Sequence, residues 1–163
     1  MAVTREVWGP VAWRFLHLSA ALSDRKDVAA LWTPFLKAMA LVLPCDLCRQ
    51  DMNRYVTQIR YSANPLTVTG AEVKDGVMRY MWAFHNSVNE RLGKPTMTWE
   101  DVVGVYEGLG SREAKIAEAE TLFPTLVAHF STSPHLRRQG GLLTAWQNRA
   151  RFLFALLASG PTV

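Results

Sequence analysis

The sequence contains only two cysteines, Cys45 and Cys48, among its 163 residues. Two cysteines cannot form the disulfide framework of a small secreted protein, so that class is excluded. A chain of this length can bury a hydrophobic core without help from metals or disulfides. The composition agrees, because apolar residues make up 49% and charged residues 20% of the chain, as in globular proteins.

Long apolar runs are missing as well. The longest, at residues 39–43 and 152–158, fall well short of the roughly 20 residues that a membrane span needs. The first 13 residues hold Arg5, Glu6 and Pro10 and no apolar stretch of signal-peptide length. We therefore expect no membrane partner and no signal peptide in this sequence. Cleavage of a longer precursor is left open.

Charge of one sign is not concentrated anywhere. The formal net charge of +4 is modest and scattered, and Arg137-Arg138 is the main adjacent basic pair outside a helical context. A nucleic-acid-binding arm would show a basic run, so we expect no nucleic-acid partner. The same charge suits an anionic cofactor.

Apolar residues recur at helical spacing nearly throughout, and no alternating strand pattern of useful length is present. We expect helices at about residues 9–23, 28–43, 45–59 and 71–92, a short one from about residue 98, and two more at 112–130 and 142–157. The predicted fold is all-α, a bundle of four helices plus a short fifth, with a helical C-terminal extension. We divide it into a domain at 1–110 and the extension at 111–163.

Single residues predict where some of these helices begin and end. Gly9-Pro10 is expected to open the first helix, and Asp27 to cap the second. Gly93, followed by Pro95, is the usual signal for the end of the fourth helix. Residues 131–141 are expected only to connect the last two helices.

The two cysteines form a C-x-x-C motif directly after Pro44, which places both thiols in the first turn of a predicted helix. Unpaired backbone N–H groups and the helix dipole favour a thiolate there. A thioredoxin-like motif would need a βαβ context, and a haem motif would need histidine where Arg49 stands. Zinc would need two further ligands, and the four histidines provide no second pair, so a redox dithiol is favoured and no metal is expected.

A second cluster of polar residues lies on the predicted fourth helix. His85 and Asn89 share a face beside Val88, and Arg91 and Lys94 follow at the helix end, where a cation can meet a phosphate. Taken alone, each residue fits a solvated helix end with a satisfied core histidine better than a binding site. The first helix, however, repeats the pattern with Trp13 and His17 at i, i+4.

Three ordered blocks carry a resemblance to a known family. They are Gly9-x-x-x-Trp13-x-x-Leu16-His17, Pro44-Cys45-x-x-Cys48, and His85-Asn86-x-Val88-Asn89-x-x-Leu92-Gly93-Lys94-Pro95. Over about residues 8–106 this pattern resembles the Erv/ALR family of FAD-linked sulfhydryl oxidases, which includes virus-encoded members. The resemblance implies that FAD lies in the mouth of the helical bundle against the C-x-x-C motif.

The resemblance also implies a role for each matched residue. Cys48 would be the thiol next to the flavin, and Cys45 the one that exchanges with protein thiol substrates; electrons would pass through FAD to O2 and give H2O2. The residues implied to contact FAD are Gly9, Trp13, His17, Cys48, His85, Asn86, Val88, Asn89, Arg91, Lys94 and Tyr106. Family members are usually homodimers through their first helices, so a homodimer is expected here.

The chain departs from the family pattern in two informative ways. Trp82 and Trp99 stand where relatives have a structural disulfide, and we expect the two indoles to pack together in its place. No second cysteine pair is present to act as a shuttle, which fits the viral type and the host cytoplasm best. The mitochondrial intermembrane space and the secretory pathway remain alternatives, as does a non-catalytic interaction module of the same fold.

Overall fold

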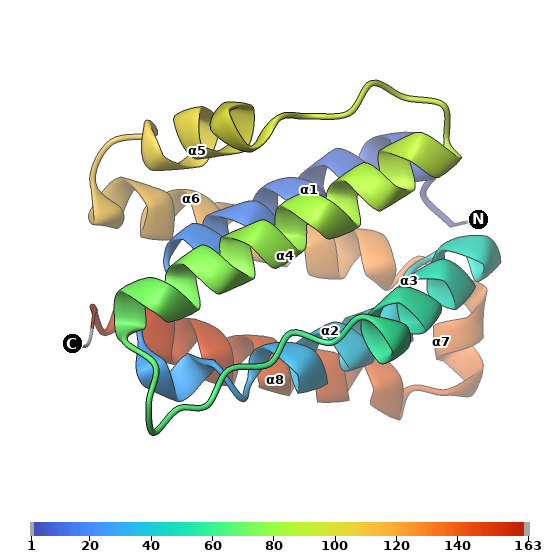
Figure 1. The fold of residues 1–163 in the computed structure, drawn as a ribbon. Helices are drawn as coiled ribbons and strands as arrows, with labels where there is room; N and C mark the ends of the chain where they lie inside the picture. Colours follow the sequence, from blue (N-terminus) through green and yellow to red (C-terminus); the bar gives the residue numbers. More distant parts are fainter. Residues whose placement is uncertain (1, 162–163) are drawn as a thin grey trace.

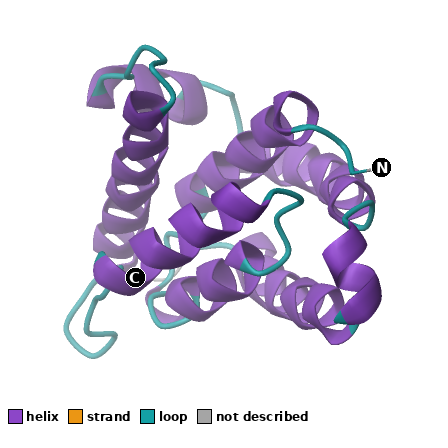
Figure 2. Cartoon of the chain, turned by 90° about the vertical axis from the view of Figure 1, so that its right-hand side faces the viewer, coloured by secondary structure: helices purple, strands orange, loops and turns teal. Residues whose placement is uncertain are grey.

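The computed structural model describes residues 2–161, and helices are the only regular secondary structure among them (Figure 2). The all-α prediction is therefore confirmed. The elements are α1 (Arg5–Ala21), the 3-10 turn η1 (Lys26–Val28), α2 (Trp32–Ala40), α3 (Asp46–Gln58), α4 (Gly70–Arg91), α5 (Trp99–Glu107), α6 (Arg112–Phe130), α7 (Pro134–Arg138) and α8 (Gly141–Ala158).

Local side-chain chemistry sets several helix ends close to where the sequence predicts them. Thr98 caps α5 with a reciprocal pair of hydrogen bonds to Asp101, at 3.0 and 3.1 Å. Gly93 adopts a positive φ of 69° after α4, and the Lys94 N–H donates to the Asn89 carbonyl at 2.8 Å. This arrangement is the glycine-terminated helix end that the sequence indicates.

Two predicted helix starts are wrong. The first helix begins at Arg5, because the Thr4 carbonyl accepts hydrogen bonds from the N–H groups of residues 7 and 8; Pro10 lies inside the helix. Asp27 does not cap the second helix. Its carboxylate instead accepts hydrogen bonds from the Arg25 guanidinium at 2.9 and 2.7 Å, and α2 begins only at Trp32.

The helices form two layers, and α1 lies in the upper one (Figure 1). In the upper layer α1 and α4 lie side by side in opposite directions, with α6 and α5 also packed against α1. In the lower layer α2 contacts both α3 and α8. Every residue from Phe15 to Ser23 is buried, so the second half of α1 is enclosed by its own chain.

The C-terminal helices pack onto this bundle rather than away from it. The Arg14 guanidinium on α1 donates two hydrogen bonds to Glu118 on α6, at 2.6 and 3.1 Å. Trp146 on α8 is 0% exposed and its ring lies 6.3 Å from that of Phe35 on α2. Phe152, in contrast, is 61% exposed, although its apolar character suggested burial.

The division of the chain into a domain at 1–110 and an extension at 111–163 stays a proposal. Residues 1, 162 and 163, at the two ends of these ranges, lie outside the described residues. Within residues 2–161, no helix is both long enough and apolar enough to cross a membrane.

Candidate functional site

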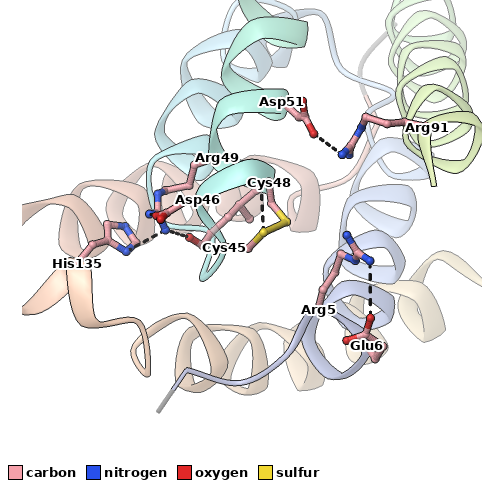
Figure 3. Close-up of a disulfide and its surroundings, with 10 residues drawn as sticks. Arg5, Glu6, Cys45, Asp46, Cys48, Arg49, Asp51, Arg91 and His135 are labelled. Atoms are coloured by element: carbon pink, nitrogen blue, oxygen red, sulfur yellow. Dashed lines mark hydrogen bonds and ion pairs between the residues drawn. A yellow bond between two sulfur atoms is a disulfide. The ribbon is translucent and has the colours of Figure 1, made fainter.

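Cys45 and Cys48 form a disulfide at the start of α3 (Figure 3). Cys45 is the N-cap residue, with an extended backbone, and its Sγ accepts a hydrogen bond from the Cys48 backbone N–H at 3.2 Å. Cys48 is only 8% exposed, whereas Cys45 is partly exposed. The motif therefore lies at a helix N-terminus, as the sequence predicts, and an external thiol reaches Cys45 more easily than Cys48.

A cleft on the buried side of the disulfide joins several of the predicted site residues. Its walls include Gly9 and Trp13 from α1, Cys48 from α3, and Val88 and Arg91 from α4. Trp8 also lines the cleft, and its buried indole Nε1 has no hydrogen-bond partner among the described residues. The cleft thus combines apolar walls and a buried sulfur with three charged residues, Arg5, Arg91 and Asp51.

Three further predicted residues join Trp13 in an aromatic cluster between α1, α4 and α5. The rings of Trp13 and His85 are stacked, with centroids 4.0 Å apart and planes inclined by 5°. His17 is stacked on Tyr106 at 4.7 Å, and a hydrogen bond of 2.8 Å joins His17 Nε2 to His85 Nδ1. Trp13 belongs to both the cleft and the cluster, so the two features are continuous.

Both histidines of this cluster are held in the neutral form. Burial, together with the nearby His85, lowers the pKa of His17 from 6.5 to about 3. Burial, together with the positive charge of Lys94, lowers the pKa of His85 to about 4. A hydrogen bond between two neutral rings needs one donor and one acceptor nitrogen, so the tautomers of the two rings are coupled and the pair presents no net charge.

We expect these histidines to make the cofactor-free protein less stable in acid. The unfolded chain binds protons near pH 6.5, whereas the folded protein excludes them until about pH 4 at His85 and about pH 3 at His17. The free energy of unfolding should therefore fall as pH drops through this window. Thermal melting between about pH 7 and about pH 4 measures it, and His17→Gln should show a shallower dependence on pH. Equal slopes in the two proteins would contradict the assignment.

Two residues of the fourth-helix block have contacts that the sequence did not indicate. The Asn86 amide forms two hydrogen bonds with the Met97 backbone, at 2.8 and 2.9 Å, and so holds the segment after α4. Arg91 forms an ion pair with Asp51 on α3 (Figure 3). Asn89 is buried and Lys94 is exposed. Contacts of these residues with a cofactor stay predictions.

Trp82 and Trp99 pack together as expected, with ring centroids 5.7 Å apart. The Trp82 Nε1–H also donates to the Met97 carbonyl at 2.8 Å, and the Arg79 guanidinium lies 4.2 Å from the Trp99 ring centroid. The pair joins α4 to the start of α5, the connection for which the family resemblance implies a disulfide.

Replacing either Trp82 or Trp99 by alanine should lower the melting temperature and weaken FAD binding. The variant loses aromatic contacts worth about 1–3 kcal/mol, and each kcal/mol moves the melting temperature of a chain of this size by about 2–4 °C. Calorimetry and FAD titration measure the two effects. Phe at either position is the control, because it keeps most of the packing. Unchanged melting and binding in both alanine variants would show that the pair has no such role.

Sequence reasoning missed two residues beside the disulfide. Asp51 lies one helical turn after Cys48, and that spacing was a signal that could have found it. His135 on α7 contacts Arg49 at 3.1 Å across 86 positions of sequence, and no local pattern indicates such a contact. No group of three or more metal-ligating side chains lies together within the described range.

A reducible disulfide at a helix start, with one buried sulfur in a cleft of neutral aromatic residues, defines a helical thiol–disulfide redox protein. The model of the Erv1/Alr family matches residues 10–107, which is more than half of the chain. The chain therefore belongs to the Erv1/Alr family, and the resemblance found in the sequence is confirmed.

Named relatives of the chain come from viruses. An FAD-linked sulfhydryl oxidase of African swine fever virus is 36% identical over 107 residues, which cover 61% of this chain and 80% of the relative. A putative FAD-linked sulfhydryl oxidase of invertebrate iridescent virus 6 is 30% identical over 94 residues, or 56% of this chain and 84% of the relative. A putative FAD-linked sulfhydryl oxidase of frog virus 3 is 28% identical over 133 residues, which cover 77% of this chain and 79% of the relative. No solved structure matches the chain.

Proposed function

We propose that this protein is an FAD-linked sulfhydryl oxidase that forms disulfide bonds in protein substrates. Electrons pass from substrate dithiols through Cys45 and Cys48 to FAD and then to O2, which yields H2O2. The observation that carries this proposal is the unequal exposure of the two sulfurs. Cys45 is open to an external thiol, while Cys48 lines a buried cleft with residues of the family's cofactor blocks.

The residues of the cleft fit such a cofactor. A flat, largely apolar ring system suits walls made by Trp13, Val88 and Cys48, and the Arg91 guanidinium at the rim suits a phosphate group. The unpaired buried indole N–H of Trp8 would be satisfied by an acceptor on the bound group. When bound, FAD supplies the two-electron chemistry that links a dithiol to O2.

The protein's own residues perform the thiol exchange. A substrate thiolate attacks Cys45 Sγ, the Cys45–Cys48 bond breaks, and Cys48 leaves as a thiolate at the helix N-terminus. The second substrate thiolate then attacks the substrate sulfur of the mixed disulfide and releases Cys45. The substrate has lost two electrons and two protons as its disulfide forms. Cys45 and Cys48 hold the two electrons until their own disulfide forms again.

The experiment that tests this function is an absorbance spectrum of the purified protein, followed by oxygen uptake on addition of dithiothreitol. A flavin band together with thiol-dependent oxygen consumption would support the proposal. A yellow protein that consumes no oxygen would point to the non-catalytic interaction module. A protein that stays colourless after addition of FAD would contradict the cofactor assignment.

We also propose a virus-encoded protein that acts in the host cytoplasm and forms a homodimer. The viral origin of the named relatives supports the first part. Because Phe15–Ser23 is enclosed by the chain itself, a dimer through the first helix would use its first half, where Val7 is 50% exposed. Sedimentation of the purified protein measures the oligomeric state.

A further inference from the structure

A second groove lies beside Cys45 and is separate from the cofactor cleft. One wall comes from the start of α3, with Pro44, Asp46 and Arg49, and the other from the segment around α7, with His135 and Arg138. Residues 44 and 46 directly flank the cysteine that we expect to exchange with substrate. Figure 3 shows the disulfide facing α1 on one side of the first turn of α3, while His135 approaches that turn from the other side.

Hydrogen bonds hold the α7 wall in place. His135 Nε2 lies 2.8 Å from the Leu41 carbonyl, which can only accept, so Nε2 carries the hydrogen. The other ring nitrogen, Nδ1, then accepts from the Ser133 hydroxyl and from Arg49 Nη1, at 2.5 and 3.1 Å. Arg49 Nη1 also donates to the Leu43 carbonyl at 2.6 Å. The wall is thus tied to the segment that leads into Cys45.

This wall carries an excess of positive charge. On the α3 wall Arg49 is paired with Asp46, whereas Arg138 on the α7 wall is exposed and has no acidic partner among the described residues. α7 also lies beyond residue 107, where the match to the family model ends. The basic wall therefore lies outside the region that the family model matches.

Two exposed apolar side chains lie close to the same cysteine in the sequence. Leu47, between the two cysteines, is 68% exposed, and Leu41 is 45% exposed. Together with the arginines they provide an apolar contact next to Cys45 and a cationic contact further along the groove. Large exposed leucines at a reactive site are typical of a surface that another chain covers.

We propose that this groove docks the protein substrate and selects an extended segment with a carboxylate side chain near its reactive cysteine. The carboxylate pairs with Arg138 while the substrate sulfur attacks Cys45 Sγ, in the exchange described above. The inference rests on the proposed function only in taking Cys45 as the cysteine that exchanges with substrate. It adds the charge of the substrate segment and the residue that recognises it.

The test compares dithiothreitol with two dithiol peptides that are identical except for acidic or basic residues beside the cysteines. The wild-type protein should oxidise the acidic peptide with a kcat/KM about 5–10-fold above that of the basic one at low salt, and salt should reduce the difference. Arg138→Glu should lower kcat/KM for the acidic peptide by about the same factor and raise it for the basic peptide. Its rate with dithiothreitol should not change.

Arg149→Glu is the matched control, because Arg149 is an exposed residue of α8 and its replacement changes the net charge equally. Equal rates for the two peptides in the wild type, or the same peptide preference in both variants, would overturn the proposal. Absence of oxygen uptake with dithiothreitol would instead overturn the proposed function. Fluorescence anisotropy of labelled peptides with serine in place of cysteine measures docking without turnover. The wild-type protein should bind the acidic peptide more tightly than the basic one, and Arg138→Glu should weaken binding of the acidic peptide.

Discussion

Replacing Cys48 by serine should abolish thiol-dependent oxygen uptake while FAD stays bound. Without Cys48, Cys45 has no disulfide partner, so a substrate thiolate has no S–S bond to attack, and no thiolate lies in the cleft to reduce the cofactor. When one member of a set of catalytic residues that act together is removed, the enzyme loses most of its rate. We therefore expect the rate of oxygen uptake to fall by roughly 10³-fold or more. An oxygen electrode measures the rate, and the visible flavin band reports the bound cofactor.

Cys45→Ser is the informative partner variant. It should also stop oxidation of protein thiols, but it keeps the buried Cys48 sulfur in the cleft. We therefore expect long-wavelength charge-transfer absorbance between a thiolate and the flavin in Cys45→Ser and none in Cys48→Ser. The reverse pattern would exchange the roles of the two cysteines. Full activity of Cys48→Ser would make the assignment wrong altogether.

Replacing Trp146 by alanine should destabilise the whole protein. Its side chain is 0% exposed and lies against aromatic residues from two other helices: Phe35 on α2, and Phe123 and Phe130 on α6. Truncation of a buried tryptophan costs about 3–5 kcal/mol, a large part of the 5–15 kcal/mol by which a typical domain is stable. Chemical denaturation followed by circular dichroism measures the change in the free energy of unfolding.

Phe152→Ala provides the control on the same helix, because that side chain is 61% exposed and should cost little. A single unfolding transition that shifts as a whole in Trp146→Ala would show that α6 and α8 unfold together with the bundle. Two transitions, of which only one shifts, would instead support a separate C-terminal unit at 111–163.

Local chemistry explains where sequence reasoning succeeded. The end of α4 depends on Gly93, and the start of α5 on Thr98 and Asp101, all within one helical turn of the boundary. The C-x-x-C motif depends in the same way on two cysteines three positions apart after Pro44. Asp27 failed as a cap because a competing partner, Arg25, binds its carboxylate.

Contacts between residues that are far apart in the sequence could not be predicted in this way. The sequence indicated Trp13, His17 and His85 as site residues, and their helical spacing placed each on a face. The stacking of Trp13 on His85 and the hydrogen bond from His17 depend on how α1 packs against α4. Trp82 and Trp99 could be paired only because the family resemblance indicated which two positions meet.

The sequence by itself determined the helical class, the redox motif at a helix start and the residues grouped around it, because these follow from periodicity, capping and spacing within a few residues. Tertiary structure alone decided that Cys48 is buried and Cys45 partly exposed, and that α7 brings His135 and Arg138 beside the motif. The physical reason is that burial and contacts across 86 positions arise from the packing of whole helices, which no local segment encodes.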